Sequence, residues 1–166
     1  MPALDKHEVR TETLPLMVLI DASNVFSRAF DKRLLPLKLS GAQQRILAAV
    51  YLAKEDLTPS MLGALLLQET HSISGLLNRL EDAELVTRTR DRRDRRVVWV
   101  GLTPAGREAA ERSLQILVSL AQELTASLGR SEKSFVRILE QTRDAGSKIA
   151  GVPEATRQEA LRRLWG

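Results

Sequence analysis

Residues 75–108 read GLLNRLEDAELVTRTRDRRDRRVVWVGLTPAGRE and change character three times. The first third belongs to an amphipathic helix. Its apolar stripe, at helical spacing, consists of Ile73, Leu76, Leu77 and Leu80. The following VTRTR and VVWVGL have the β-branched and aromatic content of strands, and DRRD lies between them where a hairpin turns. Thr103 and Pro104 then supply an N-cap and a first helical residue. The stretch therefore predicts helix, hairpin and helix.

The opposite face of the first of these helices, predicted over 70–83, is polar and rich in hydrogen-bonding groups. This polar face consists of His71, Ser72, Ser74, Gly75, Asn78 and Arg79. The small residues Ser74 and Gly75 would let another surface approach the backbone. The pattern favours a helix that meets a binding partner through its polar face.

A shorter helix is predicted over 58–67, with Thr58 as its N-cap and Pro59 at the first position. Two short helices separated by a short joint are typical of a helix-turn-helix. Thr58 and Ser60 lie at the N-terminus of this helix, where free backbone N–H groups gather.

The remaining pattern is also helical. Helices are predicted over 14–35, from Ser40 onward, over 103–129 with Gly129 as the C-terminal cap, from Ser131 to Gly146 or Gly151, and over 153–166. We therefore expect a mainly α protein with a small β-wing.

Charge is concentrated in one segment of the chain. The 166 residues carry a net charge of +4, and residues 86–107 contain seven Arg against two Asp, a local balance of +5. An arginine run is most often a solvated or disordered segment. Here strand-like residues and a capped helix bracket it, which favours a folded hairpin that binds an anion. The overall composition, 43% hydrophobic and 28% charged, is that of a globular protein.

Several classes of function are disfavoured by the composition. The chain has no Cys, which excludes disulfides and thiolate metal sites, and its two His are far apart. We find no catalytic Ser/His/Asp grouping, no paired carboxylates on a helix face and no phosphate-binding glycine loop. We therefore expect no enzyme, no cofactor and no metal. The chain has neither a signal-peptide pattern nor an apolar run of about 20 residues, so we expect a cytoplasmic protein without a membrane segment.

Residues 75–108 resemble the centre of the MarR family of bacterial transcriptional regulators. The shared pattern is RLE at 79–81, LV.R at 85–88, DRR at 94–96 and LT..G at 102–106. The resemblance is specific over about 39–108 and looser outside. It implies an N-terminal dimerisation helix over 1–36, a winged helix-turn-helix DNA-binding domain over 37–108, and C-terminal dimerisation helices over 109–166.

This chain departs from the family pattern at one position. The family commonly has Gly where this chain has Glu84. If Glu84 adopts a left-handed conformation, it carries a cost of roughly 1 kcal/mol relative to Gly. Otherwise the helix ends differently, which would change the direction in which the wing points but not the fold.

The resemblance implies a homodimer that binds double-stranded DNA sequence-specifically at a pseudo-palindromic operator, most simply a ligand-responsive repressor. It also implies that the polar face of the 70–83 helix reads bases, where Asn suits adenine and Arg suits guanine because each can form a paired hydrogen bond with that base edge. Thr58 and Ser60 are then candidates for phosphate contact. The wing residues expected at DNA are Arg88, Arg90, Arg92, Arg93, Arg95 and Arg96, with Arg95 first for insertion into the minor groove. Asp94 is expected to hold a neighbouring arginine. Because a carboxylate near phosphate is repelled, Asp94 itself should not touch DNA.

The resemblance also implies a small effector, lipophilic or aromatic, between the dimerisation helices and the DNA-binding lobe. Candidate pocket residues are Ser23, Asn24, Arg28 and Arg45, with His7 nearby. The alternative is a ligand-independent or architectural DNA-binding protein. A responsive regulator should have an apolar pocket at the lobe junction and should lose DNA affinity when its compound binds.

Overall fold

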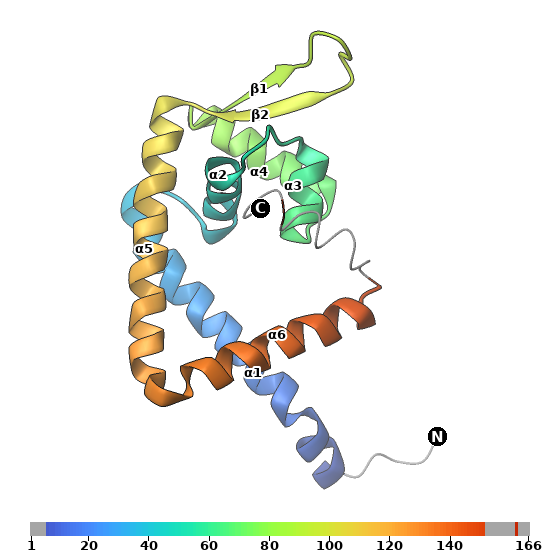
Figure 1. Ribbon diagram of the computed structural model, residues 1–166, viewed down its shortest axis with the longest axis vertical. Helices are drawn as coiled ribbons and strands as arrows, with labels where there is room; N and C mark the ends of the chain where they lie inside the picture. The colour runs from blue at the N-terminus through green and yellow to red at the C-terminus, as the bar shows by residue number, and fades with distance from the viewer. Residues whose placement is uncertain (1–5, 152–161, 163–166) are drawn as a thin grey trace. The chain divides into compact units, whose positions relative to one another are not determined.

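The computed structural model describes residues 6–151 and 162, in a chain that divides into two compact units, 1–41 and 42–166. It is mainly helical with one two-stranded antiparallel sheet, as predicted (Figure 1). In chain order the elements are α1 (Lys6–Leu34), η1 (Leu35–Leu37), α2 (Gly41–Leu52), α3 (Pro59–Leu66), α4 (Thr70–Asp82), β1 (Val86–Arg90), β2 (Val98–Leu102), α5 (Pro104–Leu128), η2 (Gly129–Ser131) and α6 (Glu132–Ile149).

Helix α1 begins at Lys6, so the predicted start at Leu14 is wrong. The prediction placed Pro15 in the first turn, where proline is favoured, whereas Pro15 lies inside the helix. A proline in a helix interior removes one backbone hydrogen bond. The remaining bonds of this 29-residue helix hold the turns on either side.

Glycines follow the C-terminal ends of α5 and α6. Gly129 (φ 53°) follows α5 as predicted, and Gly151 (φ 66°), not Gly146, follows the end of α6. Both φ values are left-handed, where glycine is unstrained. The helix predicted over 153–166 lies outside the described residues.

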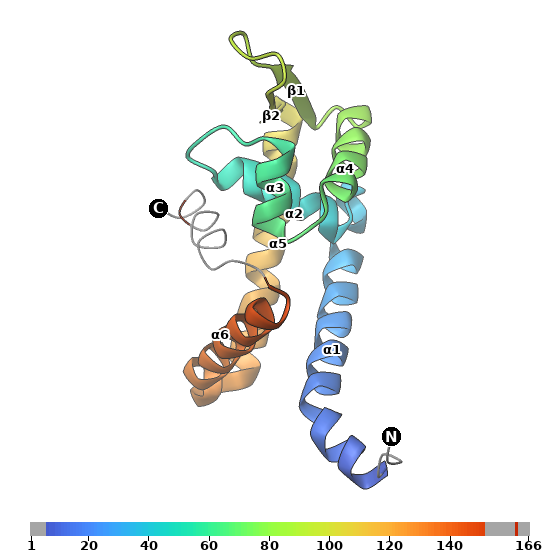
Figure 2. The same ribbon diagram turned by 90° about the vertical axis from the view of Figure 1, so that its right-hand side faces the viewer.

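The core of the second unit forms around α4. The predicted apolar stripe of α4 is buried, with Ile73, Leu77 and Leu80 fully enclosed. Helix α4 lies against α3 and β1, and β2 lies against α3 and α5 (Figure 2). Other buried apolar side chains of this core are Ile46, Leu47, Leu57, Leu62, Val86, Val100 and Ala110. The stripe thus fixes which face of α4 remains outside.

The hairpin pairs Val86 with Leu102 at its base and Arg90 with Val98 near its tip. A third short segment joins it: the Val100 N–H donates to the Leu57 carbonyl at 2.8 Å, in an isolated bridge just before α3. A one-residue bridge leaves no sequence pattern, and it was not predicted. It ties the base of the wing to the entrance of the helix-turn-helix.

Glu84 adopts the left-handed conformation, with φ 58°. The Glu84 N–H donates to the Glu81 carbonyl and the Leu85 N–H donates to the Leu80 carbonyl, both at 2.9 Å. These two bonds form the Schellman cap, in which glycine is the usual left-handed residue. The recognition helix therefore ends as it would with glycine, and the chain carries the strain of a side chain there.

Replacing Glu84 with glycine should raise the free energy of unfolding by about 0.5–1 kcal/mol. The substitution removes the strain of a side chain in the left-handed conformation. This stabilisation exceeds the destabilisation that comes from the greater conformational entropy of glycine in the unfolded chain. Chemical denaturation measures this change. The matched control is Ala83→Gly, one residue earlier at φ −85°. There glycine relieves no strain and should lower stability. Equal effects of the two substitutions would contradict the assignment.

Candidate DNA-binding interface

Local hydrogen bonds close both ends of α3. The Thr58 hydroxyl caps α3 by accepting from the Met61 N–H at 3.3 Å, and it lies 3.0 Å from the Ser60 hydroxyl. At the other end the Gln68 N–H donates to the Gly63 carbonyl at 2.9 Å. Thr58 and Ser60 therefore lie together at the N-terminus of α3, as an anion contact requires.

Gly63 is a structural requirement of this turn that the sequence analysis missed. A Cβ on this residue would lie 2.9 Å from the Gln68 carbonyl oxygen, closer than side chains tolerate. A glycine inside a helical pattern usually indicates only a weak helix, so sequence alone gave no signal. The close approach keeps the two helices in register across a short turn.

The polar face of α4 is exposed. His71, Ser72, Asn78 and Arg79 are exposed, and Ser74 and Gly75 are half-buried. A groove of about 650 Å³ follows this face, lined by Leu67, Gln68, Glu69, His71, Ser72, Gly75, Leu76 and Arg79. The structure therefore brings four of the six predicted residues to one groove.

Two residues of the polar face bond to their own helix. The Ser74 hydroxyl donates to the Thr70 carbonyl at 2.9 Å, and Arg79 Nε donates to the Gly75 carbonyl at 3.2 Å. Nothing lies within 4 Å of a Cβ built on Gly75. The backbone near Gly75 is therefore open to an approaching surface.

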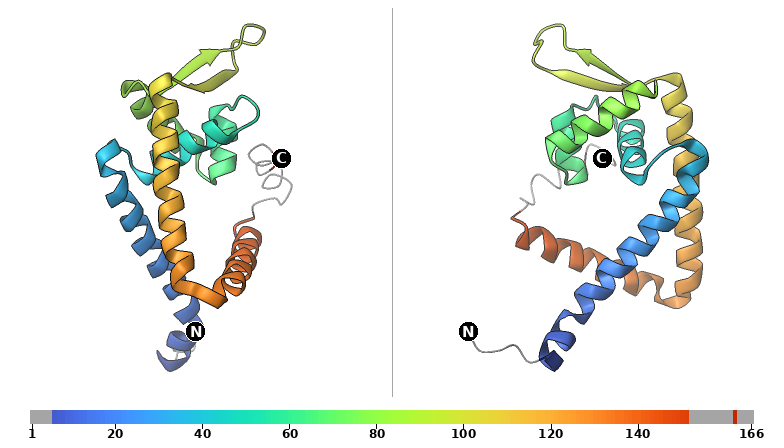
Figure 3. Two further views of the ribbon diagram at one scale, coloured as in Figure 1. Left: turned by 60° about the vertical axis from the view of Figure 1, so that its left-hand side comes forward. Right: turned by 180° about the vertical axis from the view of Figure 1, so that it is seen from behind.

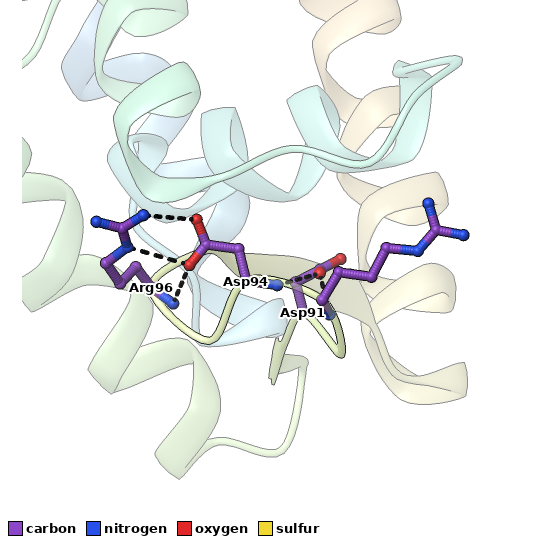
Figure 4. Close-up of polar contacts among 4 residues, drawn as sticks. Asp91, Asp94 and Arg96 are labelled. Atoms are coloured by element: carbon purple, nitrogen blue, oxygen red, sulfur yellow. Dashed lines mark hydrogen bonds and ion pairs between the residues drawn. The ribbon is translucent and has the colours of Figure 1, made fainter.

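The wing tip, residues 91–97, is organised by Asp91. Its Oδ1 accepts from the backbone N–H groups of Arg93 at 2.7 Å and Asp94 at 2.9 Å (Figure 4). Its Oδ2 accepts from the Trp99 indole N–H at 3.0 Å. These bonds, the indole first, lower the pKa of the Asp91 carboxyl. Asp91 thus holds the turn through backbone and indole donors and binds no arginine side chain.

Asp94 binds Arg96, its neighbour but one. The carboxylate accepts from Arg96 Nε at 3.1 Å and from Nη2 at 3.3 Å, and Oδ1 also accepts from the Arg96 backbone N–H at 3.0 Å (Figure 4). The Arg96 side chain lowers the pKa of Asp94. Because the Arg96 side chain is still 92% exposed, this pair lies in solvent and contributes little stability.

The other wing-tip arginines project without a partner. Arg92, Arg93 and Arg95 are exposed, and none forms an ion pair with a side chain of the described residues. Arg90, at the end of β1, is exposed as well. The tip therefore presents uncompensated positive charge at the end of a hairpin.

Arg88 differs from the other arginines of the hairpin. Its Nε donates to Glu81 Oε2 at 2.9 Å, and its Nη2 is shared between Glu81 Oε2 and Asn78 Oδ1, the latter at 2.6 Å. The Arg88 hydrogen bonds lower the pKa of Glu81. The sequence analysis missed this role of Glu81. The signal was an acid in the last turn of the helix, seven residues before an arginine.

Acid should loosen the wing tip through Asp91. Because the fold lowers the pKa of Asp91, the ionised carboxyl stabilises the folded state at pH values above its ordinary pKa, near 3.8. This contribution to stability is lost as the pH falls below that value. In a Trp165→Phe background, the Trp99 fluorescence should therefore change below about pH 4. Asp91→Asn is the control, because its amide does not titrate over this range. The same transition in both proteins would contradict the role of Asp91.

Comparison with known proteins agrees with this geometry. Residues 37–97 match the model of the MarR family. An uncharacterised HTH-type transcriptional regulator of Bacillus subtilis, YwhA, is 36% identical over 67 residues, 38% of this chain and 46% of that protein. A mutant of MarR from E. coli, solved in complex with operator DNA, is 28% identical over 80% of this chain and 96% of its own, with a TM-score of 0.69. This chain carries a MarR-family domain.

The MarR-family fold extends beyond the matched segment. The organohalide-sensing regulator RdhR, solved with 2,4-dichlorophenol, aligns over 95% of this chain and 93% of its own with a TM-score of 0.80. Its sequence identity is 22%, so the likeness concerns the fold. The match to YwhA spans less than half the length of that relative.

The residues predicted for an effector pocket belong to both compact units of the chain. Ser23, Asn24 and Arg28 are exposed on α1. Arg45, on α2, donates to the Leu66 carbonyl at the end of α3 at 2.8 Å. The His7 side chain lies outside the described residues.

A separate groove of about 470 Å³ lies along α5. It is lined by Tyr51, Glu111, Leu114, Gln115, Val118, Ser119 and Gln122, which include none of the predicted pocket residues. The Tyr51 hydroxyl donates to Glu111 Oε1 at 3.0 Å, which raises the pKa of Tyr51. The Arg107 guanidinium lies 5.7 Å from the centre of the Tyr51 ring. The groove therefore combines apolar walls with polar groups at one end.

The described residues contain neither a metal-binding cluster nor a membrane-spanning helix. None of their His, Asp and Glu side chains form a group of three or more that could hold a metal ion. Within the same part of the chain, every helix is too short or too polar to cross a membrane.

Proposed function

We propose that this MarR-family protein is a sequence-specific DNA-binding regulator of transcription that acts as a homodimer. One observation carries the proposal. Helix α4 is followed at once by the hairpin β1–β2 (Figure 3). The exposed face of the helix is rich in hydrogen-bonding groups, and the hairpin tip presents arginines without an ion pair among the described side chains. Base edges are read by a hydrogen-bonding surface such as the helix face, and phosphates are bound by positive charge such as that of the arginines. The likeness to the E. coli MarR, solved with operator DNA, supports the same partner.

The two parts of the interface have different tasks. The polar face of α4 enters the major groove of DNA and contacts bases. His71, Ser74 and Asn78 lie nearest the base edges. The wing tip follows the backbone, and Arg95 inserts into the minor groove, where the negative potential is strongest. Thr58 and Ser60 bind phosphate at the start of α3.

Dimerisation follows from apolar side chains that each unit leaves exposed. On α1 these include Leu14, Met17, Val18 and Val25, between 55% and 63% exposed. On α6 they include Val136 and Ile138, 47% and 58% exposed. Such surfaces are normally covered in solution, most simply by a second copy of the chain. A two-fold axis then requires a pseudo-palindromic operator with half-sites about 10 bp apart.

The regulator is a repressor released by a small lipophilic or aromatic compound. The groove along α5 is the site we assign to that compound, because Leu114 and Val118 provide apolar walls and Tyr51 and Gln115 provide polar contacts. A ligand-independent DNA-binding protein is the alternative. It differs in that no compound of this class would change DNA affinity.

Selection of bound DNA from a random pool tests the proposal. The expected result is one recurrent, two-fold symmetric sequence. Recovery of unrelated sequences would reduce the function to non-specific binding, and no enrichment at all would refute it. Repeating the selection with a panel of aromatic acids and phenols then tests the effector, since an effector should abolish the enrichment.

A further inference from the structure

Arg88 is the arginine of the hairpin that turns back toward α4. It lies on β1 opposite Val100, and its guanidinium reaches Asn78 and Glu81. The Arg88 side chain is 28% exposed, against 92% for Arg96 at the tip. Two of its nitrogens, Nε and Nη2, are used inside the protein. Arg88 is therefore poorly placed to neutralise a phosphate.

The contact fixes the orientation of the Asn78 side chain. A guanidinium has donors only, so the atom of Asn78 that faces Arg88 must be the amide oxygen. The distance from Arg88 Nη2 to Asn78 Oδ1 is 2.6 Å, which is short because the donor is charged. The amide nitrogen then points away from Arg88. Since Asn78 is exposed, its two N–H donors face solvent on the polar face of α4.

We propose that Arg88 is a positioning residue for base readout. It holds Asn78 with its donors outward, so that α4 reads a hydrogen-bond acceptor at this position, guanine in preference to adenine. Paired recognition of adenine needs the amide oxygen and nitrogen together, whereas guanine offers two acceptors, N7 and O6. With Oδ1 already bound by a charged donor, the guanine edge suits Asn78 better. This inference rests on the proposed function and adds the base that one position reads.

The first test uses the protein without DNA. The chain contains two asparagines, Asn24 and Asn78, so asparagine-selective ¹⁵N labelling gives two pairs of side-chain amide signals. Asn78→Ala assigns the Asn78 pair. Arg88→Ala should move that pair toward the values of a free amide, whereas Arg93→Ala, an exposed arginine in the same hairpin, should not. An unmoved Asn78 pair in Arg88→Ala would overturn the inference.

The second test is selection of bound DNA, with the salt dependence of affinity measured for each variant. The parent should select guanine at one position in each half-site. Arg88→Ala and Asn78→Ala should both lose that preference, on the order of tenfold. The double variant should be no worse than Asn78→Ala, because Arg88 acts through Asn78. Preferences at other positions should remain.

The salt dependence of DNA affinity distinguishes a positioning residue from a residue that contacts phosphate. Arg93→Ala should reduce the slope of log affinity against log salt by about 0.9 for each wing at DNA, whereas Arg88→Ala should leave it unchanged. Arg88→Lys keeps the charge without the planar fork, so it should show the base preference of Arg88→Ala. It also serves as the test variant if Arg88→Ala does not fold.

The outcomes are distinct. A smaller salt slope in Arg88→Ala with the base preference intact would make Arg88 a phosphate contact and overturn the inference. A parental preference for adenine that survives Arg88→Ala would also overturn it, while the proposed function would stand. A parent that selects no DNA would refute the proposed function and this inference together.

Discussion

Gly106→Ala should destabilise the protein by about 3 kcal/mol or more, well beyond the usual effect of one added methyl group. A Cβ on Gly106 would lie 1.8 Å from the Leu85 carbonyl oxygen, inside any allowed contact. Alanine favours a helix over glycine by about 1 kcal/mol, so intrinsic propensity has the opposite sign and is too small to prevail. The backbone must therefore move apart.

The movement would break a junction that joins α4 to α5. The Leu85 carbonyl accepts from the Thr103 N–H at 3.1 Å, and the Thr103 hydroxyl donates to the Glu84 carbonyl at 2.7 Å. The same hydroxyl accepts from the Gly106 N–H at 2.9 Å. Because these bonds fix the start of α5 to the end of the recognition helix, Gly106→Ala should also weaken DNA binding at temperatures where it remains folded.

Thermal and chemical denaturation measure the stability change, and Gly146→Ala is the matched control. Gly146 lies within α6, and nothing is within 4 Å of a Cβ built there. That substitution should stabilise the protein by about 0.5–1 kcal/mol. If Gly106→Ala unfolds at the parental midpoint, the junction relaxes without loss and the close approach is not a constraint.

The features predicted correctly from sequence are local ones. Thr58–Pro59 and Thr103–Pro104 mark helix starts because an N-cap and a first-turn proline act within one turn of chain. The buried stripe of α4 follows from helical spacing alone. Family resemblance added the expected DNA partner and left the conformation of Glu84 open. The structure settles it as left-handed.

The features that were missed depend on residues brought together by the fold. Neither the Leu57–Val100 bridge nor the approach of Gly63 to Gln68 has a pattern in the chain. The arginines of the hairpin look equivalent in sequence, because all carry the same charge. Only geometry separates Arg88, which is bound to α4, from Arg95, which has no ion pair among the described side chains.

The free wing arginines should make DNA binding strongly dependent on salt. Three of them, Arg92, Arg93 and Arg95, lack an ion pair in the described part of the chain, so a dimer would bring twice that number to DNA. Each phosphate neutralised contributes about −0.9 to the slope of log affinity against log salt. Between 50 and 200 mM salt, affinity for the selected operator should fall by roughly a thousandfold. A flat response would contradict the DNA interface altogether.

Among these arginines, Arg95 should have the largest single effect because it is assigned to the minor groove. Arg95→Ala should weaken operator binding by at least about 1 kcal/mol for each wing, or about 30-fold for a dimer, without changing the dimer. Arg130→Ala is the control, since Arg130 is an exposed arginine outside the wing. Gel retardation or fluorescence anisotropy measures affinity, and sedimentation measures the dimer. A loss in Arg95→Ala no greater than in Arg130→Ala would show that bulk charge, not groove insertion, explains the contribution of the wing, because the two substitutions remove the same charge.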